Sequence, residues 1–165
     1  MKKIEALKRI AFEKRGFDGF LITKDANLLY FAGFPGLIGL LIHEKDESTI
    51  YVHGVNYEQA KHEGKGFNVK LVKREENLME KIAKQVKGLG IKKLAMDTVT
   101  LEDHLDLSKK LRGKTRLKTQ DNLIWELRKV KDEEEIELMR RAGELTGIGM
   151  KVAYETIKPG VKEFE

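Results

Sequence analysis

The chain has 165 residues, of which 41 % are hydrophobic and 36 % are charged, and its formal net charge is +5. This length suits one domain, or one domain with part of a second, and the lack of Cys excludes a disulfide framework and thiolate chemistry. Lys and Glu are interspersed and no apolar run approaches about 18 residues, so we expect a cytoplasmic protein with no membrane-spanning segment, and the mild charge alone does not indicate nucleic acid.

The first third of the chain predicts both helices and strands. Apolar residues recur at helical spacing near the N-terminus, and a short apolar run bounded by turn residues follows. Asp25 is a candidate N-cap and Gly33 a candidate terminator of a two-turn helix. The elements expected are a helix over 2–15, a strand over 17–23, a helix over 25–33, a tight turn over 34–36, a hairpin of 37–43 and 48–52 with the polar loop 44–47, and a helix over 57–63.

From Phe67 onward, strand and helix patterns alternate. The pattern predicts strands over 67–72, 91–96 and 114–119, with helices over 77–87 and 101–111 between them. Such alternation is typical of βαβ units with parallel strands. We therefore predict one α/β domain over 1–121, with a mixed β-sheet and flanking helices, ending at the polar residues 119–122.

A long helix is predicted at the C-terminal end. Asp132 and Glu135 form a capping-box pattern, and Pro159-Gly160 ends the helix near Ile157. On a helical wheel the apolar and small residues sweep an arc of roughly 220°, about twice the usual stripe. Three glycines within this arc each cost about 1 kcal/mol relative to Ala, so we expect a closely approaching backbone there.

Four short motifs occur in a characteristic order. Asn27 to Gly33 resembles the N-x-x-Y-L/F-x-G stretch of the creatinase/prolidase family, and residues 57–60 resemble its Y-x-x-Q/M-A helix. The chain also resembles the family's interdomain signature through Leu123, Arg128, Lys131, Glu134, Glu135 and Ile136, and its K/R-P-G-x-x-E turn through Lys158, Pro159, Gly160 and Glu163. Each motif is weak, but their order over the whole chain is fairly specific.

The resemblance implies a ribonuclease-H-like N-terminal α/β domain followed by a "pita-bread" metallopeptidase domain. It divides the chain into the N-terminal domain 1–121, an interdomain linker 122–131, and the first helix and turn, 132–165, of a truncated peptidase domain. The family's two divalent metal ions and their five ligands belong to the missing part, so the chain itself should hold no metal and be inactive. The parent would be an Xaa-Pro dipeptidase or aminopeptidase, acting on Xaa-Pro peptides through the missing domain.

In this family the N-terminal domain forms a homodimer and lends a loop to the partner's active site. The corresponding residues here are Phe34, Pro35, Gly36, Leu37 and Ile38. This loop contains no His or Asp, which departs from members that contact substrate with polar groups. His53, at the end of the second hairpin strand, is the other candidate for this site.

Two other functions stay open from the sequence. A peptidase-like protein can lose its chemistry and serve as a peptide- or protein-binding module. A nucleic-acid-binding domain is the third reading, because Lys114, Arg116 and Lys118 alternate along a predicted strand, although an edge strand protected by charge is the commoner explanation.

Carboxylates and histidines suggest no metal centre in the sequence. Asp25 and Asp97 are expected as helix caps or turn formers, and Asp18 lies in a Gly-flanked turn. The four histidines have no ligand spacing, which favours structural or solvated roles.

Overall fold

A computed structural model of the chain describes residues 2–44 and 47–162. Glu163 of the predicted Pro-Gly turn motif and the centre of the predicted loop 44–47 lie outside the described residues. The contacts between residues divide the chain into two units, Met1–Leu127 and Arg128–Glu165.

The first unit is built on a mixed β-sheet, as predicted. Among the described residues six strands form one sheet in the order β4-β3-β2-β1-β5-β6. The strands are β1 (Gly19–Ile22), β2 (Leu37–His43), β3 (Thr49–Val52), β4 (Asn68–Leu71), β5 (Lys93–Met96) and β6 (Arg116–Thr119). The β2–β3 hairpin is antiparallel, and the later strands pair in parallel, β3 with β4, β1 with β5 and β5 with β6. The sequence patterns predicted both kinds of pairing.

Most helices lie where the periodicity predicts them. They are α2 (Asp25–Ala32), α3 (Tyr57–Glu63), α4 (Leu78–Gly88) and α5 (Leu101–Leu111), with a short 3-10 helix η2 (Gly54–Asn56) before α3. The predicted helix over 2–15 differs in detail, because α1 (Lys2–Lys8) continues as a π-helix, η1 (Arg9–Lys14).

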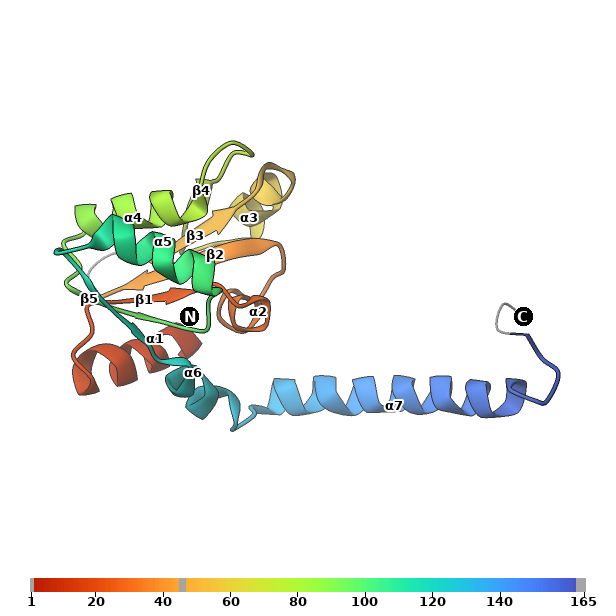
Figure 1. Cartoon of the computed structure of the whole chain (residues 1–165). Helices are drawn as coiled ribbons and strands as arrows, with labels where there is room; N and C mark the ends of the chain where they lie inside the picture. The colour runs from red at the N-terminus through yellow and green to blue at the C-terminus, as the bar shows by residue number, and fades with distance from the viewer. Residues whose placement is uncertain (1, 45–46, 163–165) are drawn as a thin grey trace. The chain divides into compact units, whose positions relative to one another are not determined.

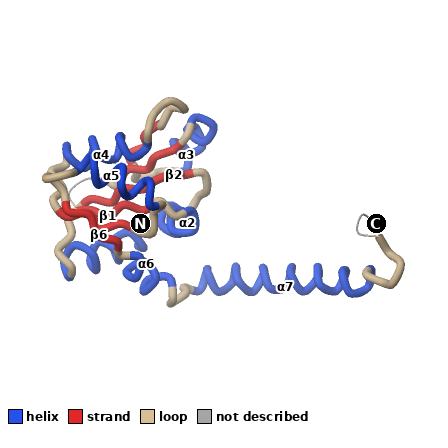
Figure 2. Tube along the Cα trace, in the orientation of Figure 1, coloured by secondary structure: helices blue, strands red, loops and turns tan. Residues whose placement is uncertain are grey.

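Helices cover both faces of the sheet (Figures 1 and 2). Neighbouring β1 residues show the division, since Phe20 and Ile22 pack with α1 and α2 whereas Leu21 packs with α4 and α5. Both sets of side chains are inaccessible to solvent. The near-continuous apolar strands thus reflect burial on two faces, which is typical of a sheet with helices on each side.

Helix α6 (Asp121–Arg128) overlaps the segment 122–131 that the resemblance assigned to a linker. Leu123 and Ile124 are buried in the same core as α1 and α2. The spacing of Leu123, Ile124 and Leu127 is helical, and the burial of this stripe extends the packed structure beyond the predicted boundary.

Strand β6 is an edge strand, which confirms the structural interpretation of its charge pattern. Arg116 and Lys118 on the strand and Lys114 before it are all exposed. Charged side chains of this kind discourage the pairing of an edge strand with another chain.

The second unit contains helix α7 (Glu133–Thr156), which has the predicted capping box. The Asp132 carboxylate accepts a hydrogen bond from the Glu135 N–H at 2.9 Å, and Glu135 accepts one from the Asp132 N–H at 3.0 Å. No residue of α7 is buried. Within the described residues, no helix is long and apolar enough to cross a membrane.

Candidate functional site

The carboxyl ends of β1 and β5 lie side by side because these two strands are parallel neighbours. They define one edge of the sheet, the edge formed by the ends of the strands. Thr23 and Lys24 follow β1 and lead into α2, and Asp97 follows β5. The N-termini of β2 and α2 reach the same edge, since β2 is antiparallel to β1. This edge therefore gathers the segments that the sequence analysis placed near a partner's active site.

Asp97 is a fully buried carboxylate that ties β5 to the start of α2. Its Oδ1 accepts hydrogen bonds from the Thr23 N–H at 3.0 Å and the Thr23 hydroxyl at 3.2 Å. Its Oδ2 accepts from the Lys24 N–H at 3.1 Å and the Asn27 side-chain amide at 3.0 Å. Burial raises the pKa of Asp97, although these hydrogen bonds act in the opposite direction.

This arrangement corrects the predicted roles of two aspartates. Asp97 does not cap the helix that follows it, because Thr100 is the N-cap of α5 and accepts from the Asp103 N–H. Asp25 is an exposed residue of the first turn of α2, and the N-cap is Lys24, whose N–H is bound by Asp97. Among the described residues, no side chain caps α2; Asp97 instead accepts from the two N–H groups that precede the helix and from the Asn27 side chain.

The loop after α2 is held in a defined conformation. Gly33 ends the helix with φ +85°, and Gly36 has φ +89°, which is the left-handed region that favours glycine. The Asn56 side-chain amide donates a hydrogen bond to the Gly36 carbonyl at 3.0 Å. A Cβ at Gly36 would lie 2.7 Å from the Asn56 side chain, so a larger residue there would displace Asn56 from this contact.

The predicted site residues differ in their surroundings. Phe34 and Leu37 are buried in the core shared with α1 and α2, and Pro35 between them is exposed. Ile38 is half-buried against the opposite core, beside α4 and α5.

His53 is exposed after β3, with Nδ1 3.3 Å from the Val72 carbonyl oxygen. Three residues later, Asn56 reaches Gly36, so the two predicted segments are joined through a residue that the sequence analysis did not single out. Asn56 precedes helix α3 as a typical N-cap residue would, but its side chain makes no cap bond there.

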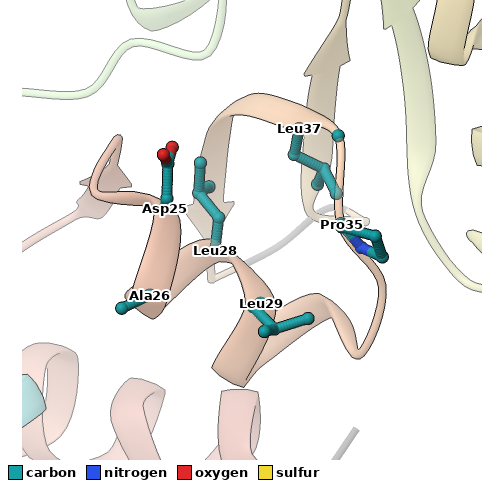
Figure 3. Close-up of a pocket in the computed structure, with 7 residues that line it drawn as sticks. Asp25, Ala26, Leu28, Leu29, Pro35 and Leu37 are labelled. Atoms are coloured by element: carbon teal, nitrogen blue, oxygen red, sulfur yellow. The ribbon is translucent and has the colours of Figure 1, made fainter. Parts of the chain in front are cut away.

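A hollow of about 250 Å³ lies between α2 and this loop (Figure 3). Figure 3 shows Leu28 and Leu29 on the helix, with Pro35 and Leu37 across from them. The lining residues are Asp25, Ala26, Leu28, Leu29, Pro35, Gly36 and Leu37. With mostly apolar walls and one carboxylate, the hollow suits an apolar side chain and offers no nucleophile paired with a base.

The described residues offer no metal centre, since no three His, Cys, Asp or Glu side chains among them come together. Asp97, the one fully buried carboxylate in this set, already receives four hydrogen bonds. The described residues therefore do not have the ligands of a dinuclear metal site. The resemblance places that site in another part of the protein.

Comparison with known proteins gives one consistent result. Residues 3–130 match the model of the Creatinase/Prolidase N-terminal domain. The chain is 32 % identical to an Xaa-Pro dipeptidase from Pyrococcus furiosus, over 99 % of this chain and 45 % of that protein.

Two solved structures resemble the whole chain. An Xaa-Pro dipeptidase from Bacillus anthracis has a TM-score of 0.83 at 29 % identity, and the prolidase from Pyrococcus horikoshii has a TM-score of 0.80 at 30 % identity. Each match covers 99 % of this chain and 45 % of the other. The chain thus spans a little under half the length of these relatives.

Proposed function

The chain belongs to the creatinase/prolidase N-terminal domain family, and from this premise we propose that it serves an Xaa-Pro dipeptidase or aminopeptidase as a non-catalytic domain. In this role it forms a homodimer and shapes access to the partner's active site. The observation that carries the proposal is the match over nearly the whole chain to proteins named Xaa-Pro dipeptidase.

The contacts that hold the loop in place support its proposed role in shaping access to the partner's active site. Buried Phe34 and Leu37 hold residues 34–38 against the core, and the Asn56 side chain donates a hydrogen bond to the Gly36 carbonyl. Exposed Pro35 is thereby presented on a rigid support. A loop held this way can define one wall of a neighbouring cavity without losing conformational entropy on binding.

We assign the chemistry to a dinuclear metal site outside the described residues. In the whole enzyme such a site would supply Lewis-acid chemistry for hydrolysis of the peptide bond before proline. The residues of this chain contribute walls and contacts to that reaction and move no proton in it.

The test compares the chain with a fusion in which it replaces the matching 45 % of the Pyrococcus furiosus dipeptidase. We expect the fusion to hydrolyse an Xaa-Pro dipeptide with Mn²⁺, Co²⁺ or Zn²⁺, and the 165-residue chain to show no turnover. Turnover by the chain alone would refute a non-catalytic role. A fusion that is folded and binds metal but has no activity would count against the access-shaping role.

Homodimer formation is tested separately by light scattering after size-exclusion chromatography. A dimer has twice the monomer mass of 18.9 kDa. A monomer at every concentration of both the chain and the fusion would contradict this part of the proposal.

A peptide-binding module is the second candidate, and the hollow between α2 and the loop favours it. Its apolar walls and single carboxylate could take an apolar side chain next to a positive charge. A Leu29→Gln variant, at a lining residue that is 50 % exposed, should abolish peptide binding by a chain without catalytic activity if this candidate is right, and no detectable peptide binding by the parent chain would exclude it.

A further inference from the structure

The loop 34–38 and the start of η2 lie at the same open end of the β2–β3 hairpin. Leu37, the first residue of β2, pairs with Val52, the last residue of β3. The chain before Leu37 and the chain after Val52 therefore run beside each other. This is why Gly36 and Asn56 meet although they are 20 residues apart in the sequence.

The side chain of Asn56 is not used where its position would suggest. Asn56 occupies the N-cap position of α3, where an Asn side chain usually accepts a hydrogen bond from the helix. It makes no such bond here. Its amide instead donates to the Gly36 carbonyl oxygen at 3.0 Å, and both residues are half-buried. The side chain thus contributes to the loop and not to its own helix.

This hydrogen bond fixes one peptide unit of the loop. Glycine has access to a wider range of backbone angles than other residues, and Gly36 has φ +89°. Because a peptide group is planar, a bond to the Gly36 carbonyl also fixes the direction of the Leu37 N–H. Gly36 and Leu37 both line the hollow beside α2. Asn56 therefore determines the shape of the surface that the loop presents.

A β-bulge lies directly after this peptide unit. The pairing of β2 with β3 shifts between Leu37 and Gly39, so Ile38 is an extra residue in β2. Bulges of this kind bend a strand and re-aim its side chains, and they occur often beside active sites. The bulge and the Asn56 contact thus act on adjacent residues where the loop enters the sheet.

We propose that Asn56 is a positioning residue, whose hydrogen bond holds loop 34–38 in the conformation that contacts substrate in the partner's active site. The inference rests on the proposed function and adds that a residue outside the loop determines substrate affinity. A wall that contacts substrate away from the reacting bond stabilises the bound substrate and the transition state equally. Loss of the Asn56 donor should therefore raise KM and leave kcat unchanged.

The first test uses the fusion with the Pyrococcus furiosus dipeptidase, assayed with an Xaa-Pro dipeptide and Mn²⁺. Asn56→Asp keeps the size of the side chain and its ability to cap α3, but a carboxylate cannot donate to the Gly36 carbonyl. Asn56→Ala removes the donor without adding charge. Each variant should raise KM roughly two- to fivefold, because loss of one hydrogen bond lowers the fraction of loops in the binding conformation.

Asn68→Asp is the matched control, because it makes the same change of charge at an exposed asparagine of β4. It should leave KM and kcat at the parent values.

Two comparisons separate positioning from stability. A Cβ at Gly36 would displace Asn56, so Gly36→Ala should also raise KM, and adding Asn56→Asp to it should raise KM no further. In urea denaturation, Asn56→Asp should unfold at nearly the parent concentration. A rise in KM that comes with a fall in both kcat and stability would show a merely structural role and overturn the inference.

A measurement on the 165-residue chain tests the positioning without any activity. NMR relaxation of the Gly36 and Leu37 amides should give order parameters of about 0.85 in the parent, as in rigid backbone, and below about 0.6 in Asn56→Asp. The amide of Leu41, within β2, should stay rigid in both chains. Order parameters that do not change at Gly36 and Leu37 would overturn the inference.

The proposed function and this inference fail in different ways. A parent fusion without activity counts against the proposed function; falling order parameters in the chain then uphold the positioning of the loop, and unchanged ones overturn it. An active fusion whose KM is the same in the parent, Asn56→Asp and Asn56→Ala leaves the proposed function standing and overturns this inference.

Discussion

Replacing Asp97 by Ala tests whether one buried carboxylate holds α2 to the sheet. The change removes both oxygens and leaves the Asn27 amide and the N–H groups of Thr23 and Lys24 without their acceptor. An unsatisfied buried donor costs about 1–3 kcal/mol. Asn27 is buried, so its amide lies near the upper end, whereas the two backbone groups are partly buried and can recover water.

The expected loss of unfolding free energy is about 3 kcal/mol, after allowing for relief of a buried charge that offsets part of the cost. For a unit of this size it corresponds to a fall in Tm of roughly 10 °C. Urea denaturation followed by circular dichroism measures the free energy directly, and hydrogen exchange should show faster exchange in α2 than in α4 or α5.

Asp25→Ala is the matched control, because Asp25 is on the same helix but exposed. It should change the unfolding free energy by less than about 1 kcal/mol, through the helix dipole alone. A double variant, Asp97→Ala with Asn27→Ala, should cost less than the sum of the singles because the two groups share a hydrogen bond. If Asp97→Ala costs no more than Asp25→Ala, the reasoning about this network is wrong.

Three further outcomes follow from local geometry. Burial raises the pKa of Asp97, so the folded chain holds the carboxyl proton of Asp97 more tightly than the unfolded chain does. The stability lost in Asp97→Ala should therefore be greatest below the ordinary Asp pKa and should shrink as the pH rises through the raised pKa. Urea titrations that show a loss growing with pH would contradict this. Gly36→Ala should destabilise by about 1–3 kcal/mol in denaturation experiments, partly relieved by Asn56→Ala, which removes the clash but not the positive φ. Asp132→Ala should cost α7 about 1 kcal/mol and lower its helicity, whereas Asp132→Asn should retain most of the cap; equal losses would argue against the capping box.

The elements of the fold were predictable where local chemistry decides the structure. The hairpin, the alternating strands and helices, and the capping box at Asp132 all depend on residues close together in the chain. Helix α6 was missed because its polar flanks resemble a linker. Its helical character is decided by burial of Leu123 and Ile124 against residues far earlier in the sequence.

The site was only partly predictable, because its contacts are long-range. Asp97 and Asn27 are 70 residues apart, and no local pattern says which strand will lie beside β1. An Asp directly after a buried parallel strand was the available signal, and it indicated a turn as readily as an anchor. Asn56 was missed for a similar reason. Its position just before α3 is typical of an N-cap residue and gives no sign of its hydrogen bond to Gly36.

The two units differ in how far their side chains are buried. Among the described residues, no buried side-chain polar atom lacks a hydrogen bond. Helix α7 has none of its residues buried and contains glycines that its own surroundings do not explain. Within the α/β unit, a test for partner binding should begin at the loop, where Pro35 is exposed.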